Sequence, residues 1–145
     1  MATNAIGGFR AQLRVSSDGL TYTRLGEVQV LTLDDRAAEI AANHHDDIAY
    51  ENAIQGRSKW RLTGTVNYIY NDAGQAVVRT AKLTQAPLYV KLMPYELVGR
   101  EKFTGQGIVV QWGISGDDNA VAGSPFEISG SGALVPGTIV AGDLA

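Results

Sequence analysis

The sequence predicts a mostly β protein: an antiparallel β-sandwich or barrel with one flanking α-helix. Apolar and polar residues alternate along several stretches, of which residues 60–70 are the clearest. Only residues 72–85 combine a helical apolar stripe with a good capping residue. Turns rich in glycine, asparagine and aspartate separate the alternating stretches, which is typical of an antiparallel sheet.

Length and composition narrow the class further. The chain has 145 residues, with 12 Lys and Arg, 15 Asp and Glu, and no Cys. This length is typical of one domain, so we expect residues 1–145 to fold as a single unit. The lack of cysteine excludes disulfide and thiolate chemistry. A net charge of −3 argues against a dedicated nucleic-acid binder, which normally carries a basic stripe.

No apolar run is long enough to cross a membrane, and the first residues do not resemble a secretory signal. We therefore expect no membrane partner and synthesis in the cytoplasm.

Two strands are expected near the amino terminus. Residues 9–15 alternate between apolar and polar side chains, which predicts a half-buried strand. The turn signal Ser17-Asp18-Gly19 follows, and residues 20–24 are expected to pair back across it. Residues 27–33 are rich in β-branched side chains but alternate poorly, which indicates a bulge or a strand covered on both faces.

Residues 34–58 are the longest stretch without sustained periodicity. Their only candidate element is a short helical stretch between Ala37 and Ala42. A connection this long inside one domain is unusual and is commonly functional. We therefore expect a long loop after the second strand.

The remaining elements are easier to predict. In residues 60–70, Trp60, Leu62 and Val66 share one face, whereas Arg61, together with Lys59 just before this range, belongs to the polar face. Three further segments are expected to be strands, and the chain end is expected to be an arm. In order, these are residues 88–92, 103–114, 126–128 and the carboxy-terminal arm at about 133–145.

The single expected helix begins after Asp72, a good N-cap residue, and ends before Pro87. Ala73, Val77 and Ala81 form its apolar stripe.

No catalytic arrangement is recognisable. The cluster His44-His45-Asp46-Asp47 is the only candidate metal site, but adjacent residues of an extended chain point to opposite sides, so a surface loop is favoured. The acidic pairs Asp34-Asp35 and Asp117-Asp118 lie in predicted turns or loops and are better explained as solvated residues. We expect neither enzyme activity nor a cofactor.

The aromatic residues allow a second interpretation. Trp60, Tyr68, Tyr70 and Trp112 could together stack against a sugar or a nucleic-acid base. Their alternate spacing on two strands favours a place in the sheet core.

Taken in order, several short motifs resemble the tail tube (major tail) proteins of long non-contractile-tailed phages and related gene transfer agents. The resemblance covers residues 9–134: an amino-terminal hairpin, a long loop, a long strand, a helix and further strands. The motifs are GEVQV at 26–30, IQGRSKW at 54–60, APLYVK at 86–91, FTGQGIVV at 103–110 and FEISGSGAL at 126–134.

This resemblance implies a structural virion protein. Subunits of the family form hexameric rings that stack into a hollow tube, and DNA passes through the tube to the host without specific binding. Expected partners are other copies of the chain and the tail terminator, tape measure and distal tail proteins. The expected location is the virion tail, after synthesis in the host cytoplasm.

The long loop at 34–58 occupies the position of the family's assembly loop. The resemblance therefore implies that it contacts neighbouring subunits or rings. The candidate contact residues are Asp35, Arg36, Glu39, His44, His45, Asp46, Asp47 and Tyr50.

Two alternatives stay open. One is a β-sandwich binding module that recognises a glycan or a protein through Trp60, Trp112 or the long loop. The other is a related secretion-tube or tail-completion ring protein, which shares the fold.

Overall fold

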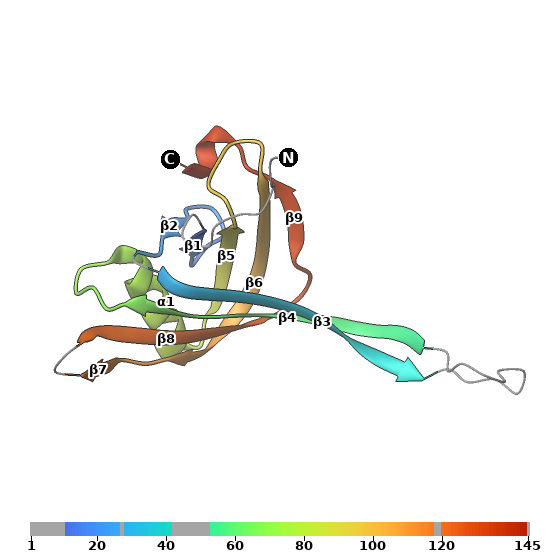
Figure 1. Cartoon of the computed structure of the whole chain (residues 1–145), viewed down its shortest axis with the longest axis horizontal. Helices are drawn as coiled ribbons and strands as arrows, with labels where there is room; N and C mark the ends of the chain where they lie inside the picture. The colour runs from blue at the N-terminus through green and yellow to red at the C-terminus, as the bar shows by residue number, and fades with distance from the viewer. Residues whose placement is uncertain (1–10, 27, 42–52, 118–119, 145) are drawn as a thin grey trace, which may run out of the picture.

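Figure 1 shows the computed structural model of the chain, which describes residues 11–26, 28–41, 53–117 and 120–144. Nine strands, one α-helix and a short 3-10 helix lie within these residues. The strands are β1 (Gln12–Ser16), β2 (Thr23–Arg24), β3 (Val28–Ala41), β4 (Ala53–Asn67), β5 (Pro87–Met93), β6 (Glu101–Trp112), β7 (Ser115–Asp117), β8 (Ala120–Gly130) and β9 (Val135–Thr138). The helices are α1 (Ala73–Thr84) and η2 (Ala141–Leu144).

All nine strands belong to one antiparallel sheet with the order β2-β1-β5-β6-β8-β4-β3. β7 pairs with β8, and β9 pairs with β6. The long strand β6 joins two layers: residues 103–108 pair with β5, and residues 107–112 pair with β8. We call β6, β8, β4 and β3 the lower layer, and β2, β1, β5 and the first part of β6 the upper layer. The prediction of a mostly antiparallel β fold with one helix is confirmed. Within the described residues the sheet stays open and does not close into a barrel.

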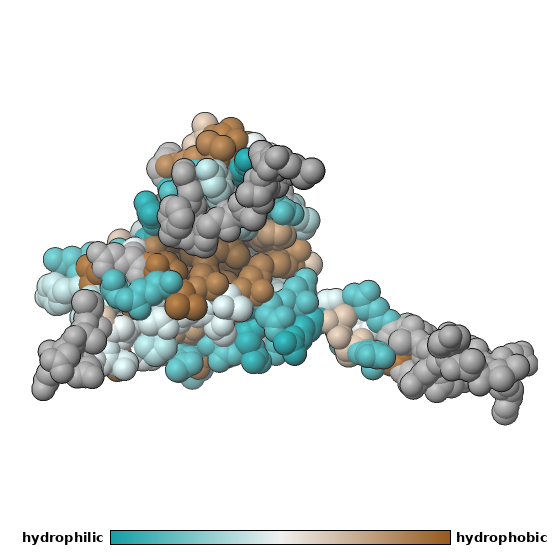
Figure 2. Space-filling model, in the orientation of Figure 1, coloured by the Kyte–Doolittle hydropathy of each residue, from teal (hydrophilic) through white to brown (hydrophobic). Residues whose placement is uncertain are grey.

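The core fills the space between the two layers. Trp60, Leu62 and Val66 of β4 are buried on one face, as the alternation predicted. Phe126 and Ile128 of β8 lie beside them in register. The other layer and the helix contribute Leu13, Val15, Leu88, Val90 and Val78. Figure 2 shows apolar surface between the layers on this side, while the lower layer is mostly hydrophilic outside.

The helix begins and ends where the sequence predicted. Asp72 is the N-cap, and its carboxylate accepts hydrogen bonds from the backbone N–H of Gln75 at 3.0 Å and of Gly26 at 3.2 Å. Gln85 closes the helix in a left-handed conformation, with φ of 58°. β5 then starts at Pro87. A single aspartate therefore fixes the helix and the chain entering β3 together.

Several strand boundaries differ from the sequence prediction, and the largest differences are at β3 and β4. β3 runs to Ala41 and β4 starts at Ala53, so the expected long loop is wrong for residues 34–41 and 53–58, which are paired strands, and the candidate helical stretch from Ala37 is wrong as well. Cross-strand backbone hydrogen bonds override the helical preference of the alanines. At its other end β4 stops at Asn67, and Tyr70 lies outside the sheet with its side chain exposed.

The carboxy-terminal segment expected to be an arm packs onto the protein instead. β9 pairs with residues 101–104 of β6, and η2 follows it. Ile139 is buried, and its backbone N–H donates to the Arg100 carbonyl at 2.7 Å. A buried side chain at 139, between Gly137 and Gly142, gave no periodic signal in the sequence.

Candidate self-association surfaces

The β3–β4 hairpin extends beyond the rest of the sheet as a two-stranded arm (Figure 1). We define the arm as residues 34–41 and 53–59, because the pairing of β4 with β8 begins only at Arg61. The described arm side chains are exposed or half-exposed. A two-stranded ribbon in water is only marginally stable. The arm therefore gains stability from any surface that covers it.

The predicted loop residues are divided between the arm and the undescribed part of the chain. Asp35, Arg36 and Glu39 lie on β3, opposite Trp60, Lys59 and Gln55 of β4, and are exposed. Arg36 forms an ion pair with Asp34 at 2.7 Å, and both side chains are open to solvent, where such pairs contribute little. His44, His45, Asp46, Asp47 and Tyr50 lie outside the described residues.

The arm contains a β-bulge between Ala37 and Glu39. Gly56 lies opposite, where an added Cβ would be 3.0 Å from the Ala38 carbonyl oxygen and 3.3 Å from Cδ1 of Ile40. A bulge bends a strand and increases its twist. The end of the arm is therefore bent relative to its base. Ala38 and Ile40 form a small apolar surface near the bend.

The outer face of the lower layer is polar, as predicted from the alternation along β4. Lys59 and Arg61 are exposed, and the threonines beyond them are half-exposed. Arg61 pairs with Glu127 of β8 at 2.9 Å. Together with the Arg36–Asp34 pair, this makes the face one of mixed charge rather than a basic stripe.

Two strand edges of the lower layer pair with no further strand among the residues that the structure describes. β3 ends the strand order and pairs only with β4 among the described residues. At the other side, residues 109–112 of β6 pair with β8, while β5 reaches only as far as Ile108. Val110 lies at a register shift on this edge and is 42% exposed. Unpaired strand edges are templates for pairing with another chain.

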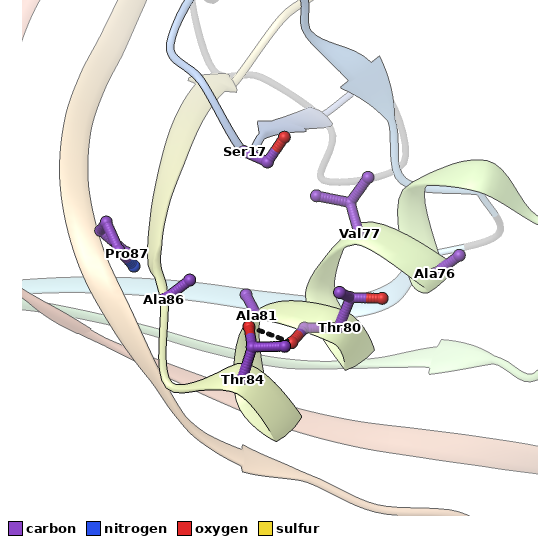
Figure 3. Close-up of a pocket in the computed structure, with 8 residues that line it drawn as sticks. All are labelled: Ser17, Ala76, Val77, Thr80, Ala81, Thr84, Ala86 and Pro87. Carbon is purple, nitrogen blue, oxygen red and sulfur yellow. Dashed lines mark hydrogen bonds between the residues drawn. The ribbon is translucent and has the colours of Figure 1, made fainter.

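A shallow groove of about 250 Å³ lies between α1 and the start of β5. Figure 3 shows side chains of the helix facing this space, with Ser17 at its far side. We call it the α1–β5 groove; it is lined by Ser17, Ala76, Val77, Thr80, Ala81, Thr84, Ala86 and Pro87. The Thr84 hydroxyl donates to the Thr80 carbonyl at 2.8 Å, so the helix itself satisfies it. The groove is therefore mainly apolar.

A buried charge cluster holds the carboxy-terminal segment. The Asp143 carboxylate accepts hydrogen bonds from Lys102 at 2.7 Å, from Lys91 at 2.8 Å and from the Val140 N–H at 2.9 Å. Burial of Asp143 opposes its ionisation, but these hydrogen bonds outweigh that effect and hold the pKa well below its usual range. Lys91 also lies 4.3 Å from the centre of the Tyr22 ring. The cluster joins η2 to β5 and β6.

A second perturbed carboxylate shapes the first turn. Backbone N–H groups of Thr21 and Leu20 and the Ser16 hydroxyl donate to Asp18, and they lower its pKa to about 2. Asp18 lies at the surface, so this arrangement is that of a turn rather than of a catalytic acid. The predicted turn is therefore present, although β2 behind it is only two residues long.

The aromatic residues do not form a stacking platform. Trp60 is 1% exposed and Trp112 is half-buried against the core.

Among the described residues, no three histidine or acidic side chains are grouped to hold a metal ion. The candidate cluster at 44–47 lies outside those residues. In the same described part, no helix is long and apolar enough to cross a membrane.

Sequence reasoning missed the β6 edge and the α1–β5 groove. Val77 and Ala81 belong to the stripe that predicted a buried helix face, yet Val77 is only half-buried and lines the groove. The alternation along residues 103–114 predicted a strand but carried no signal for where β5 stops pairing with it.

The fold is that of tail-tube proteins. Superposed on a subunit in the tail of an empty gene transfer agent (GTA) particle with C6 symmetry, the chain gives a TM-score of 0.80, with 11% identity, 90% of this chain and 98% of that chain covered. The SPP1 tail tube gives 0.73, with 13% identity, covering 94% and 81%. The baseplate of the anti-feeding prophage gives 0.63, with 11% identity, covering 94% and 97%. No family model and no curated protein sequence matches the chain.

Proposed function

We propose that the chain is a structural tail-tube subunit, whose copies form hexameric rings that stack into a hollow tube for DNA. The observation that carries the proposal is the lower layer: four strands with a polar outer face and an open edge on each side. The tail-tube fold and the sixfold symmetry of a GTA tail with this fold agree with it.

The two open edges suit each other in direction. Neighbours in the series β6-β8-β4-β3 are all antiparallel, so β6 and β3 run in opposite directions. The β6 edge of a rotated copy therefore continues the antiparallel pattern beside β3. Such a head-to-tail contact closes into a ring when the rotation closes. Six copies would supply about 24 strands and, at ~4.8 Å spacing and ~40° tilt, a barrel roughly 50 Å across.

The polar face of the lower layer, which points away from the core, is suited to line the lumen of the tube. Two of its cations are paired with acids, Arg61 with Glu127 and Arg36 with Asp34. With a chain charge of −3, the wall lacks the basic stripe that would hold phosphates. DNA then passes without specific binding.

The arm is the proposed contact between rings, because it extends along the strand direction of the lower layer (Figure 1). The residues assigned to this contact are Asp35, Arg36, Glu39, His44, His45, Asp46, Asp47 and Tyr50. On this proposal the chain functions in the virion tail, after synthesis in the host cytoplasm, with no catalytic step. Tail terminator, tape measure and distal tail proteins complete the structure.

Negative-stain microscopy of concentrated protein, combined with its mass in solution, tests the proposal. We expect sixfold rings or tubes about 10 nm wide. This width is larger than the barrel diameter estimated above, because the helix and loops form a further layer outside the barrel. Protein that stays monomeric at high concentration, even when an assembled tube end is added as a seed, would overturn it.

A further inference from the structure

The arm carries an apolar side chain, toward its far end, that the described residues leave largely exposed. Ile40 is 52% exposed, and Ala38, which lies on the same face of β3, is also exposed. Cδ1 of Ile40 lies near Gly56 rather than against a core. Covering this surface would remove apolar area from water, which is favourable.

The α1–β5 groove has the size and lining to receive such a side chain. Its volume of about 250 Å³ falls below the roughly 300–1,000 Å³ typical of small-molecule sites. Ala76, Ala81 and Ala86 leave space that larger residues would fill. No charged side chain lines it. An aliphatic side chain from a protein is therefore a better occupant than a polar ligand.

The two surfaces lie at opposite ends of the molecule. In Figure 1 the arm extends to one side of the lower layer, and α1 lies at the other. A side chain at the end of the arm therefore cannot reach the groove of its own chain. Complementary surfaces at opposite ends of one chain produce head-to-tail contacts between copies.

Charge supports the same pairing. α1 contains Arg79 and Lys82 and no acidic residue. The sequence between the two strands of the arm, residues 42–52, contains Asp46, Asp47 and Glu51 and no Lys or Arg. The opposite charges of these two parts of the sequence favour the encounter of two copies in this orientation.

We propose that Ile40 of one copy docks into the α1–β5 groove of a second copy, in the next ring along the tube. This inference rests on the proposed function and names the surface that receives the arm.

The lack of native cysteine makes a direct test possible. In the double variant Ile40→Cys/Thr80→Cys, oxidation of assembled material is expected to yield a ladder of disulfide-linked multimers. Thr80 is exposed and lines the groove, so it is open to a partner. The matched control is Ile40→Cys/Thr138→Cys, because Thr138 is exposed on β9. Tubes without a ladder, or an equal ladder in the control, would overturn the docking but leave the tube function standing.

A second pair of variants tests the apolar contact without cross-linking. Ile40→Asp is expected to raise the protein concentration needed for tube formation about tenfold or more, whereas Ile40→Leu leaves it nearly unchanged. Circular dichroism should show both monomers folded, because the side chain contacts no core. An equal response of the two variants contradicts the docking, and failure of the unmodified protein to form tubes overturns both proposals.

Discussion

Gly130 lies directly against the indole ring of Trp60. A Cβ at position 130 would be only 2.5 Å from Nε1 and from Cε2 of that ring. Gly105 of β6 approaches the same indole, where a Cβ would be 2.8 Å from Cζ2. The largest buried side chain thus occupies a slot formed by glycines of two neighbouring strands. Gly130 ends β8 and begins the Gly-Ser-Gly sequence that contributed to the resemblance, so the first glycine of that sequence has a packing role.

Gly130→Ala should destabilise the monomer by about 1–3 kcal/mol, the range for overpacking a core. Urea unfolding followed by tryptophan fluorescence measures the change. Gly142→Ala is the matched control, because nothing lies within 4 Å of a Cβ there. If the two variants were equally stable, the slot around Trp60 would not be rigid.

Asp143→Asn should loosen η2 and destabilise the protein by at most about 3 kcal/mol. This value is the low end of the range observed when one partner of a buried ion pair is removed. The lysines can swing into solvent, which keeps the loss small. Because the folded pKa of Asp143 lies below its unfolded value of ~3.9, the stabilisation is fully present above that value. It is lost as the pH falls through the folded pKa.

The difference in free energy of unfolding between Asp143→Asn and the unmodified protein should therefore be constant from pH 7 to about pH 5. It should begin to shrink below about pH 4 and continue to shrink as the pH falls further. Denaturant unfolding at a series of pH values measures this. A difference that does not change down to pH 2 would show that the carboxylate charge is not what holds η2.

Val110→Pro should block ring formation and leave the monomer folded. Proline is tolerated at a bulge, and Val110 lies at the register shift between β6 and β8. Proline lacks a backbone N–H, and its ring hinders the approach of another strand to β6 at this position. Sedimentation of assembled material, with Val110→Thr as the control, provides the measurement. Normal rings from the proline variant would place the ring contact elsewhere.

Replacing residues 38–57 by an Asn-Gly turn, which joins the cross-strand pair Ala37 and Ser58, should abolish tube growth, because the arm is the proposed contact between rings. The monomer should keep a melting temperature within a few degrees of the unmodified protein, because the described arm side chains contact no core. Differential scanning calorimetry and microscopy measure the two effects. Loss of folding would instead make the arm part of the core.

Local signals predicted much of the fold. The N-cap at Asp72, the alternation along β4 and the proline after the helix each act within a few residues, and the structure places them as expected. The alanine-rich part of the arm was misjudged because its strand depends on pairing across the hairpin. The burial of Ile139 depends on contacts with Arg100 and Gly99, which no local pattern encodes.

Surfaces for self-association were the least visible in the sequence. Asp35, Arg36 and Glu39 were named for their place in a long connection, and they do lie exposed on the arm. The β6 edge depends on where β5 ends, and the groove depends on the distance between a helix and a strand. Neither is a property of residue spacing along one element.

The arm also makes the molecule directional. It extends from one end of the lower layer, whereas the β7–β8 hairpin closes the other end (Figure 1). Any axial stack of such subunits has polarity: one terminus offers free arms and the other offers none. A protein that caps the first terminus must accept arms, and one that caps the second must supply a substitute for them. The two ends of such a filament therefore require different capping proteins, and growth can be restricted to one of them.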